Sequence, residues 1–192
     1  METSALTEVR KHLRAGRVYR REDLVQWSAS VDRHLRTLVG EGDLKKLRYG
    51  LYYCPKRFAF GEAPASEHEL VQAFLKTDHF VVTSPNLYNQ LGLGTTQLYN
   101  KRVVYNRKRH GHFLLDGRRF SFRRPKSFPP TLSKEFLYVD ALNNKKELLE
   151  DTSRLESLVA TRIKRSDQKK LLVVAKRYGK VATRKFFEAL VY

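Results

Sequence analysis

The 192-residue sequence predicts an α+β fold in two domains, one over residues 1–60 and one over residues 61–192. Three observations predict it. In the first domain an amphipathic helical segment precedes a short basic hairpin. In the second domain strand-like segments dominate residues 102–124, and helical segments follow residue 137. Hydrophobic residues make up 41% of the chain and aromatic residues 11%, so it can build packed cores and is not a disordered protein.

The first domain begins with two predicted helices joined by an extended segment. The apolar residues within 3–14 share one helical face, and Gly16 ends this helix. Residues 17–19 are predicted to be extended, and residues 21–27 to form a second, short helix.

A third helix is predicted over residues 30–39. The residues with the spacing of one apolar helix face are Val31, Leu35, Leu38 and Val39. Ser28 and Ser30 are candidate N-caps, and Gly40 and Gly42 end the helix. The opposite side presents Arg33, Arg36 and Thr37, with Asp32 and His34 on the flanks.

A basic hairpin is predicted directly after this helix, over residues 44–55. Its turn is Tyr49-Gly50, because glycine permits the positive φ that a tight turn needs. Pro55 ends the second strand, since proline cannot donate to a strand ladder. The charged residues of the first strand are Lys45, Lys46 and Arg48.

Helix, short strand, helix, helix and basic hairpin, in this order, predict a winged helix-turn-helix. Its third helix would enter the major groove of double-stranded DNA, where arginine can donate two hydrogen bonds to guanine. The predicted DNA contacts are Ser28, Ser30, Arg33, His34, Arg36 and Thr37 around the helix and Lys45, Lys46, Arg48 and Tyr49 in the wing. The alternative is a helix whose arginines are only solvated. The order of the elements favours DNA binding; no single residue does.

The second domain is predicted to begin with helix and strand after a connection over residues 56–64. A capping box of Ser66 and Glu69 begins a helix over residues 65–77. A strand and a short helix follow over residues 79–83 and 84–91.

Residues 102–124 predict a small sheet of three antiparallel strands, with turns near His110-Gly111 and Asp116-Gly117. In the last strand the two faces hold Phe120 and Phe122 on one side and Arg119, Ser121 and Arg123 on the other. A second basic surface, for a phosphate backbone or an acidic protein, is predicted at Arg107, Lys108, Arg109, Arg118, Arg119, Arg123 and Arg124. The alternative is an ordinary meander with a solvated basic face.

The remaining residues predict a C-terminal helical bundle. Its helices are expected over residues 137–149, 152–164, 166–178 and 180–190. Phe186, Phe187 and Leu190 make the last helix strongly apolar, so it must dock on other residues. A protein core is the default and a dimer interface the alternative, so we expect a monomer or a weak dimer.

The positive charge is spread along the whole chain. There are 38 basic and 20 acidic residues, a net charge of +18. Residues 1–60, 61–132 and 133–192 contain 13 basic against 7 acidic residues, 11 against 5 and 14 against 8. Such a field implies a polyanionic partner, and nucleic acid fits best, with an affinity that falls steeply in salt.

Cys54 is the only cysteine, so no internal disulfide can form and a cytoplasmic location is expected. The N-terminal residues lack the apolar segment of a signal peptide, and no stretch approaches the roughly eighteen apolar residues of a membrane span. We therefore expect no contact with a membrane.

No pattern of catalytic residues is evident, so we expect no enzyme, no cofactor and no metal site. His110 and His112 could place two imidazoles on one side of an extended segment, but no third ligand is near in sequence. A metal-dependent nuclease would need clustered acids, and Asp116 is the only acidic residue in 80–132.

Six segments share their pattern with one known family. They are Gly16–Tyr19, Asp23-Leu24, Val31–Gly42, the wing Leu47–Pro55, Ser84–Leu93 and Tyr138–Asn144. In these segments the sequence resembles the AbiEi-type antitoxins, the transcriptional repressors of type IV toxin–antitoxin systems. The resemblance implies a repressor that binds inverted repeats in its own promoter. It also implies functional pairing with a nucleotidyltransferase-like toxin, which the antitoxin opposes without forming a tight complex.

Two alternatives stay open. A stand-alone regulator of phage or plasmid origin would have the same first domain and no toxin. An RNA-binding regulator would use the aromatic and basic sheet, and single-stranded RNA would then compete for binding.

Overall fold

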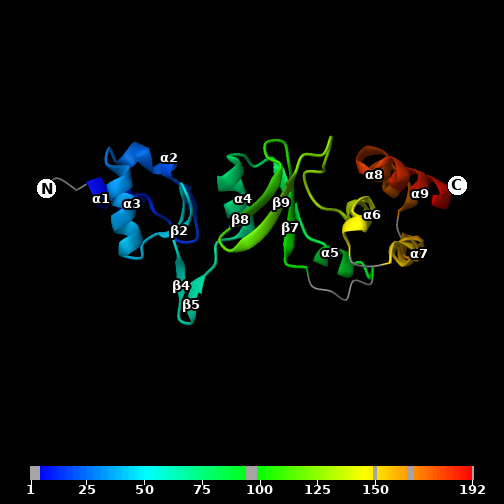
Figure 1. Cartoon of the computed structure of the whole chain (residues 1–192), viewed down its shortest axis with the longest axis horizontal. Coiled ribbons are helices and arrows are strands. Elements are labelled where there is room, and N and C mark those ends of the chain that lie inside the picture. Colours follow the sequence, from blue (N-terminus) through cyan, green and yellow to red (C-terminus); the bar gives the residue numbers. More distant parts are fainter. Residues whose placement is uncertain (1–4, 94–98, 149–150, 164–166, 192) are drawn as a thin grey trace. The chain divides into compact units, whose positions relative to one another are not determined.

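The computed structural model describes residues 5–93, 99–148, 151–163 and 167–191 (Figure 1). The chain is a mixed α+β protein with small sheets and C-terminal helices, which confirms the predicted fold class at this level. Its contacts form two units, which we describe separately: one contains Met1–Asp78 and Leu114–Arg118, the other His79–Phe113 and Arg119–Tyr192. These units are defined by contacts, so the domain boundary at residue 60 stays a prediction.

The first unit has short elements in an alternating order. They are α1 (Ala5–His12), β1 (Val18–Arg20), α2 (Arg21–Leu24), η1 (Val25–Trp27), α3 (Val31–Gly40), β2 (Lys45–Arg48), β3 (Leu51–Tyr53), β4 (Lys56–Phe58), β5 (Gly61–Ala63) and α4 (Glu67–Leu75). Three strands form an antiparallel sheet in the order β1-β3-β2, in which Val18 and Lys45 both lie opposite Tyr53.

The apolar face of α3 lies at the centre of this unit's core. The buried cluster consists of Val9, Leu24, Val31, Leu35, Leu38 and Leu44. Burying each such side chain contributes about 1.5–3 kcal/mol, so this face holds the helix in place. After α3 the chain turns at Gly42, whose φ is +78°, and the N–H of Leu44 donates to the carbonyl of Leu38 (3.0 Å).

The connection predicted over residues 56–64 is instead a hairpin, formed by β4 and β5. It is attached to the preceding elements by two hydrogen bonds. The Tyr53 hydroxyl donates to the carbonyl of Ala63 (2.8 Å), and Arg57 Nη2 donates to the carbonyl of Gly42 (2.7 Å). The residues of β4 are all exposed, so the sequence has no alternation of apolar and polar residues from which to predict these strands.

The second unit combines a sheet with a set of helices. Its elements are β6 (Phe80–Thr83), α5 (Asn86–Asn89), β7 (Lys101–Asn106), β8 (Gly111–Leu115), β9 (Arg118–Arg123), α6 (Lys134–Asn143), η2 (Lys145–Glu147), α7 (Thr152–Ile163), α8 (Gln168–Tyr178) and α9 (Val181–Val191). By contacts, Leu114–Arg118, which comprise the end of β8, the turn after it and the first residue of β9, belong to the first unit.

The strand order corrects the predicted meander over residues 102–124. The order is β6-β7-β9-β8, with β6 antiparallel to β7 and β7 parallel to β9. The last strand therefore lies between the two strands that precede it, and it is covered on both faces. Phe120, Phe122 and Ser121 are all buried, with Ser121 only 3% exposed. The predicted basic face of this strand is wrong at Ser121, because the middle of the strand is buried on both faces, whereas Arg119 near its start is exposed.

Helix α6 is the central helix of the second unit. All of its residues from Phe136 to Leu142 are buried, and it begins three residues before the predicted start at 137. Ser133 explains that start, since its Oγ accepts a hydrogen bond from the N–H of Phe136 (3.1 Å).

The C-terminal helices α7, α8 and α9 pack with α6 in one apolar cluster, as the predicted bundle requires. Phe187 of the last helix is fully buried in this cluster, and Leu190 is exposed. The docking of the last helix on a protein core is thereby confirmed.

Candidate nucleic-acid interface

The outer side of α3 presents the predicted polar residues. Arg33 and Arg36 are exposed, and Thr37 is half-buried. Arg36 Nε donates to the carbonyl of Asp32 and Thr37 Oγ1 to the carbonyl of Arg33, both at 3.3 Å. Within the described residues, neither guanidinium forms an ion pair with a carboxylate. Both can therefore donate to an acceptor outside the protein.

The start of α3 corrects two predicted contacts. Ser28 and His34 are 5% and 7% exposed, and Ser28 Oγ and His34 Nδ1 share a hydrogen bond of 2.8 Å. Ser30 is the N-cap residue and is exposed, and its N–H donates to Ser28 Oγ (3.1 Å). Ser28 and His34 cannot touch a ligand from inside the core; they hold the first turn of α3 in place.

Arg21 connects the hairpin β2–β3 with α3. Its N–H donates to the carbonyl of Gly50 (2.9 Å), and its Nε and Nη2 donate to the two carboxylate oxygens of Asp32 at 2.6 Å each. The hydrogen bonds from Arg21 hold the pKa of Asp32 below its ordinary value. The role of Arg21 could not be predicted from the sequence. Its partners lie in other elements, and a contact between different elements leaves no local sequence pattern.

The hairpin β2–β3 exposes all four of its predicted contact residues, Lys45, Lys46, Arg48 and Tyr49. Lys45 and Lys46 are exposed, Tyr49 at the turn is 91% exposed, and Gly50 has the predicted positive φ of +72°. Arg48 is different, since its guanidinium carbon lies 5.3 Å from the ring centre of Phe74 on α4. The hairpin therefore presents two lysines and a tyrosine, with Arg48 already in contact with the protein.

The second predicted basic surface divides into three groups. Five of its residues are exposed: Arg107, Lys108, Arg109, Arg119 and Arg124. Arg118 belongs to the first unit, where it hydrogen-bonds the carbonyl of Ala65 and pairs with Asp116. Arg123 is half-buried and bonded within the second unit. The prediction of one continuous surface is therefore wrong at Arg118 and Arg123.

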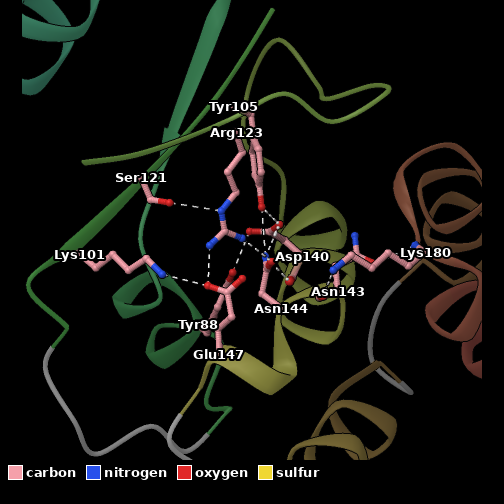
Figure 2. A network of polar contacts seen from close by, with 10 residues as sticks. All are labelled: Tyr88, Lys101, Tyr105, Ser121, Arg123, Asp140, Asn143, Asn144, Glu147 and Lys180. Carbon is pink, nitrogen blue, oxygen red and sulfur yellow. Dashed lines mark hydrogen bonds and ion pairs between the residues drawn. The ribbon is translucent and has the colours of Figure 1, made fainter. Parts of the chain in front are cut away.

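Arg123 is part of a network of polar contacts in the second unit (Figure 2). Its Nη1 donates to Asn144 Oδ1 (2.8 Å), and its Nη2 donates to Glu147, which also accepts from Lys101 Nζ (2.9 Å). Burial alone would raise the pKa of Glu147, but the hydrogen bonds from Arg123 and Lys101 outweigh it and hold the pKa below its ordinary value.

The centre of the network is the carboxylate of Asp140 on α6, which is 1% exposed. The Tyr88 hydroxyl donates to Oδ2 (2.7 Å), while the Tyr105 hydroxyl (2.6 Å) and Asn144 Nδ2 (3.0 Å) donate to Oδ1. Burial raises the pKa of Asp140, and the three hydrogen bonds oppose that rise. Nothing in the sequence indicated this group except an acid inside an apolar helix.

We compared the chain with protein-family models, with curated proteins and with solved structures. None of them matches it. The resemblance to the AbiEi-type antitoxins therefore rests on the sequence segments that gave rise to it.

A search of the described residues finds no helix with the length and hydropathy of a membrane span. Nor do three histidine, cysteine, aspartate or glutamate side chains in that part of the chain come together as metal ligands, so His110 and His112 belong to no such group.

Proposed function

We propose that this chain is a sequence-specific DNA-binding protein whose first unit is a winged helix-turn-helix, with α3 as the recognition helix and β2–β3 as the wing. The observation that supports this most strongly is the element order α1-β1-α2-α3-β2-β3 together with the sheet order β1-β3-β2. In that arrangement a helix with one buried face is followed by a hairpin, and both expose positive charge.

The proposed contacts differ in what they do. Arg33 and Arg36 donate to base edges in the major groove and determine sequence preference. Lys45, Lys46 and Tyr49 contact the phosphate backbone or the minor groove and hold the domain in register. Ser30, which is exposed, and Thr37, which is half-buried, remain proposed DNA contacts through their hydroxyls.

Arg21 positions both parts in this proposal. Because it binds Gly50 in the wing and Asp32 in the first turn of α3, it fixes the angle between wing and helix. A bidentate guanidinium–carboxylate pair is directional, so it suits that task better than a lysine would.

We further propose that the chain represses its own promoter as the antitoxin of a type IV toxin–antitoxin system, with no catalytic activity of its own. The resemblance of six sequence segments to the AbiEi-type antitoxins supports this part. It places the operator at inverted repeats and pairs the chain functionally with a nucleotidyltransferase-like toxin. Co-expression with a neighbouring toxin gene tests it. The toxin alone should inhibit growth, and expression of this chain with the toxin should restore growth.

The DNA-binding proposal is tested by footprinting and gel shifts on DNA upstream of the gene. Arg33→Ala should lose about 1–3 kcal/mol of specific binding and relax base preference, because it removes donors to a base edge. Arg154→Ala, which removes one exposed arginine from α7, is the matched control and should bind as the unchanged protein does. If Arg33→Ala binds its operator with unchanged affinity, α3 is not the recognition helix.

Two other outcomes would redirect the proposal. Specific DNA binding without rescue from a toxin would identify a stand-alone regulator. Displacement of the protein from its operator by single-stranded RNA, at concentrations at which duplex competitors have no effect, would identify an RNA-binding regulator.

A further inference from the structure

The second unit contains a cavity of about 560 Å³ that the proposed DNA contacts leave unused. It lies where the end of β9, the end of α6, the end of α8 and the start of α9 meet. Its volume falls within the range of cavities that hold small organic ligands.

The cavity is lined by a concentration of positive charge. Its cationic side chains, apart from Arg123, are Arg124, Lys126, Lys176, Arg177, Lys180 and Arg184. Asp140 is the one acid in its lining, and within the described residues none of these six cations forms an ion pair. In the first unit, by contrast, Arg17, Arg20 and Arg21 are each paired with a carboxylate.

Like charges gathered around one cavity repel one another. Their repulsion is relieved by a bound anion, and a cavity with low-dielectric walls strengthens that attraction. The cations therefore favour a ligand with more than one negative charge.

The inner wall of the cavity is aromatic and rigid. Phe136 packs edge-on against Tyr105 and Tyr178, with ring centres 6.3 and 5.5 Å apart. Phe128 also lines the cavity. Such a wall favours a planar apolar group, because an aromatic ring can stack or pack edge-on against it.

The floor of the cavity adds fixed polar groups. Asp140 and Asn144 are held in the network of Figure 2, and Asn143 accepts from the N–H of Lys180 (2.8 Å) while its carbonyl accepts from Lys180 Nζ (2.7 Å). Their polar atoms are already hydrogen-bonded within the protein, so they fix the shape of the floor and are not themselves free to bind a ligand. They are positioned by contacts within the protein, so little order is lost when a ligand binds.

We propose that this cavity binds a nucleoside phosphate, with the phosphates among the cations that follow β9, lie in α8 and surround the start of α9, and the base against the aromatic wall. Several cations that form no ion pair within the described residues, together with an aromatic wall, match the phosphates and the base of that ligand class. The proposal stands on the second unit alone and does not depend on DNA binding by α3.

Isothermal titration calorimetry of the full chain near physiological salt tests it. The probes are ATP, GTP, pyrophosphate, adenosine and a 5′-phosphorylated tetraribonucleotide. A nucleoside triphosphate should bind with one-to-one stoichiometry, and at least about tenfold more tightly than pyrophosphate or adenosine. If the tetraribonucleotide binds more tightly than ATP, the nucleoside phosphate that the cavity binds is the phosphorylated 5′ end of an RNA strand.

Matched double variants locate the binding site. Lys176→Gln with Arg184→Gln removes one lining cation each from α8 and α9, and should weaken nucleotide binding at least about tenfold. Lys169→Gln with Lys185→Gln removes two exposed cations from the same helices outside the cavity, and should change it less than about twofold. Thermal denaturation of both variants checks that each is folded.

Three results would overturn the proposal. They are the absence of saturable binding by ATP and GTP, binding of pyrophosphate as tightly as of ATP, and equal loss of binding in the two double variants. The second result would leave a simple anion site, and the third only a general charge effect.

Discussion

At the scale of single residues, Asp140 shows how a buried charge is kept in a protein core. An isolated carboxylate inside a core is very costly, so its oxygens must be hydrogen-bonded. Tyr88, Tyr105 and Asn144 supply donors to both oxygens. Burial also raises the pKa of Tyr88 and of Tyr105, so both hydroxyls keep their protons and donate at neutral pH.

Replacement of this carboxylate should destabilise the protein. Asp140→Asn puts an amide donor where hydroxyl donors already point, and it should lower the free energy of unfolding by about 1–3 kcal/mol. Urea denaturation followed by circular dichroism measures it. Asp151→Asn, at an exposed residue before α7, keeps an oxygen that can accept from Ser153 and should stay within about 0.5 kcal/mol. Equal losses in the two variants would show that the hydrogen bonds to Asp140 add no stability.

Glu147 should make the stability of the protein depend on pH. Its pKa is lowered in the folded chain, so the ionised form contributes stability above the ordinary value of 4.5. That contribution is lost as the pH falls through the lower folded pKa. We therefore expect Glu147→Gln to be less stable than the unchanged chain near neutral pH.

The difference between these two proteins should shrink as the pH falls below about 4.5. Denaturation curves at a series of pH values, compared between the two proteins, measure this. A difference in stability that is constant or that grows in acid would contradict this prediction, because the ionised carboxylate of Glu147 would then not be what stabilises the fold.

At the scale of elements, two helices that are each preceded by a serine differ in whether that serine caps the helix. Ser133 and Ser30 each precede a helix, and both are good N-cap residues by type. Only Ser133 uses its hydroxyl, which accepts from Phe136 N–H, whereas the Ser30 side chain accepts no cap hydrogen bond. The chain before α3 is held by Ser28 and His34 instead.

The two serines should therefore respond differently to the same change. Ser133→Ala should cost about 1 kcal/mol of stability, because it leaves an N–H in the first turn of α6 without its acceptor. Ser30→Ala should stay within about 0.5 kcal/mol. Thermal and urea denaturation of both variants would show it, and a larger loss from Ser30→Ala would reverse the assignment.

At the scale of the whole molecule, pairing decides where the charge of +18 acts. Many arginines of the first unit are neutralised by nearby acids, such as Arg10 by Glu41 and Asp43. Arg33, Arg36, Lys45 and Lys46 have no such partner among the described residues, so α3 and its hairpin keep a positive charge that no acid neutralises.

Binding to DNA should accordingly be salt-dependent, with a linear relation between the logarithms of affinity and salt concentration. Lys46→Ala should weaken all duplexes alike and reduce the slope by about 1, because one phosphate contact is lost. Titrations at several salt concentrations measure the slope. If Lys46→Ala changes base preference and leaves the slope unchanged, Lys46 contacts a base and not a phosphate.

The sequence by itself determined the helices with a clear apolar face, the turns at glycine, the hairpin after α3 and the excess of positive charge. These depend on neighbouring residues and on composition, so a local pattern contains them. Its predictions for Arg33, Arg36 and Tyr49 as exposed residues also agree with their positions.

Only the tertiary structure decided which polar residues are inside and which strands are neighbours. Ser28, His34 and Arg123 are polar and were predicted as contacts, yet their partners hold them within the protein. The place of β9 between β7 and β8, the hairpin of β4 and β5, the pair of Arg21 with Asp32 and the cation-lined cavity all depend on residues distant in sequence. The physical reason is that burial and pairing are properties of the folded surroundings, and no short stretch of sequence specifies those surroundings.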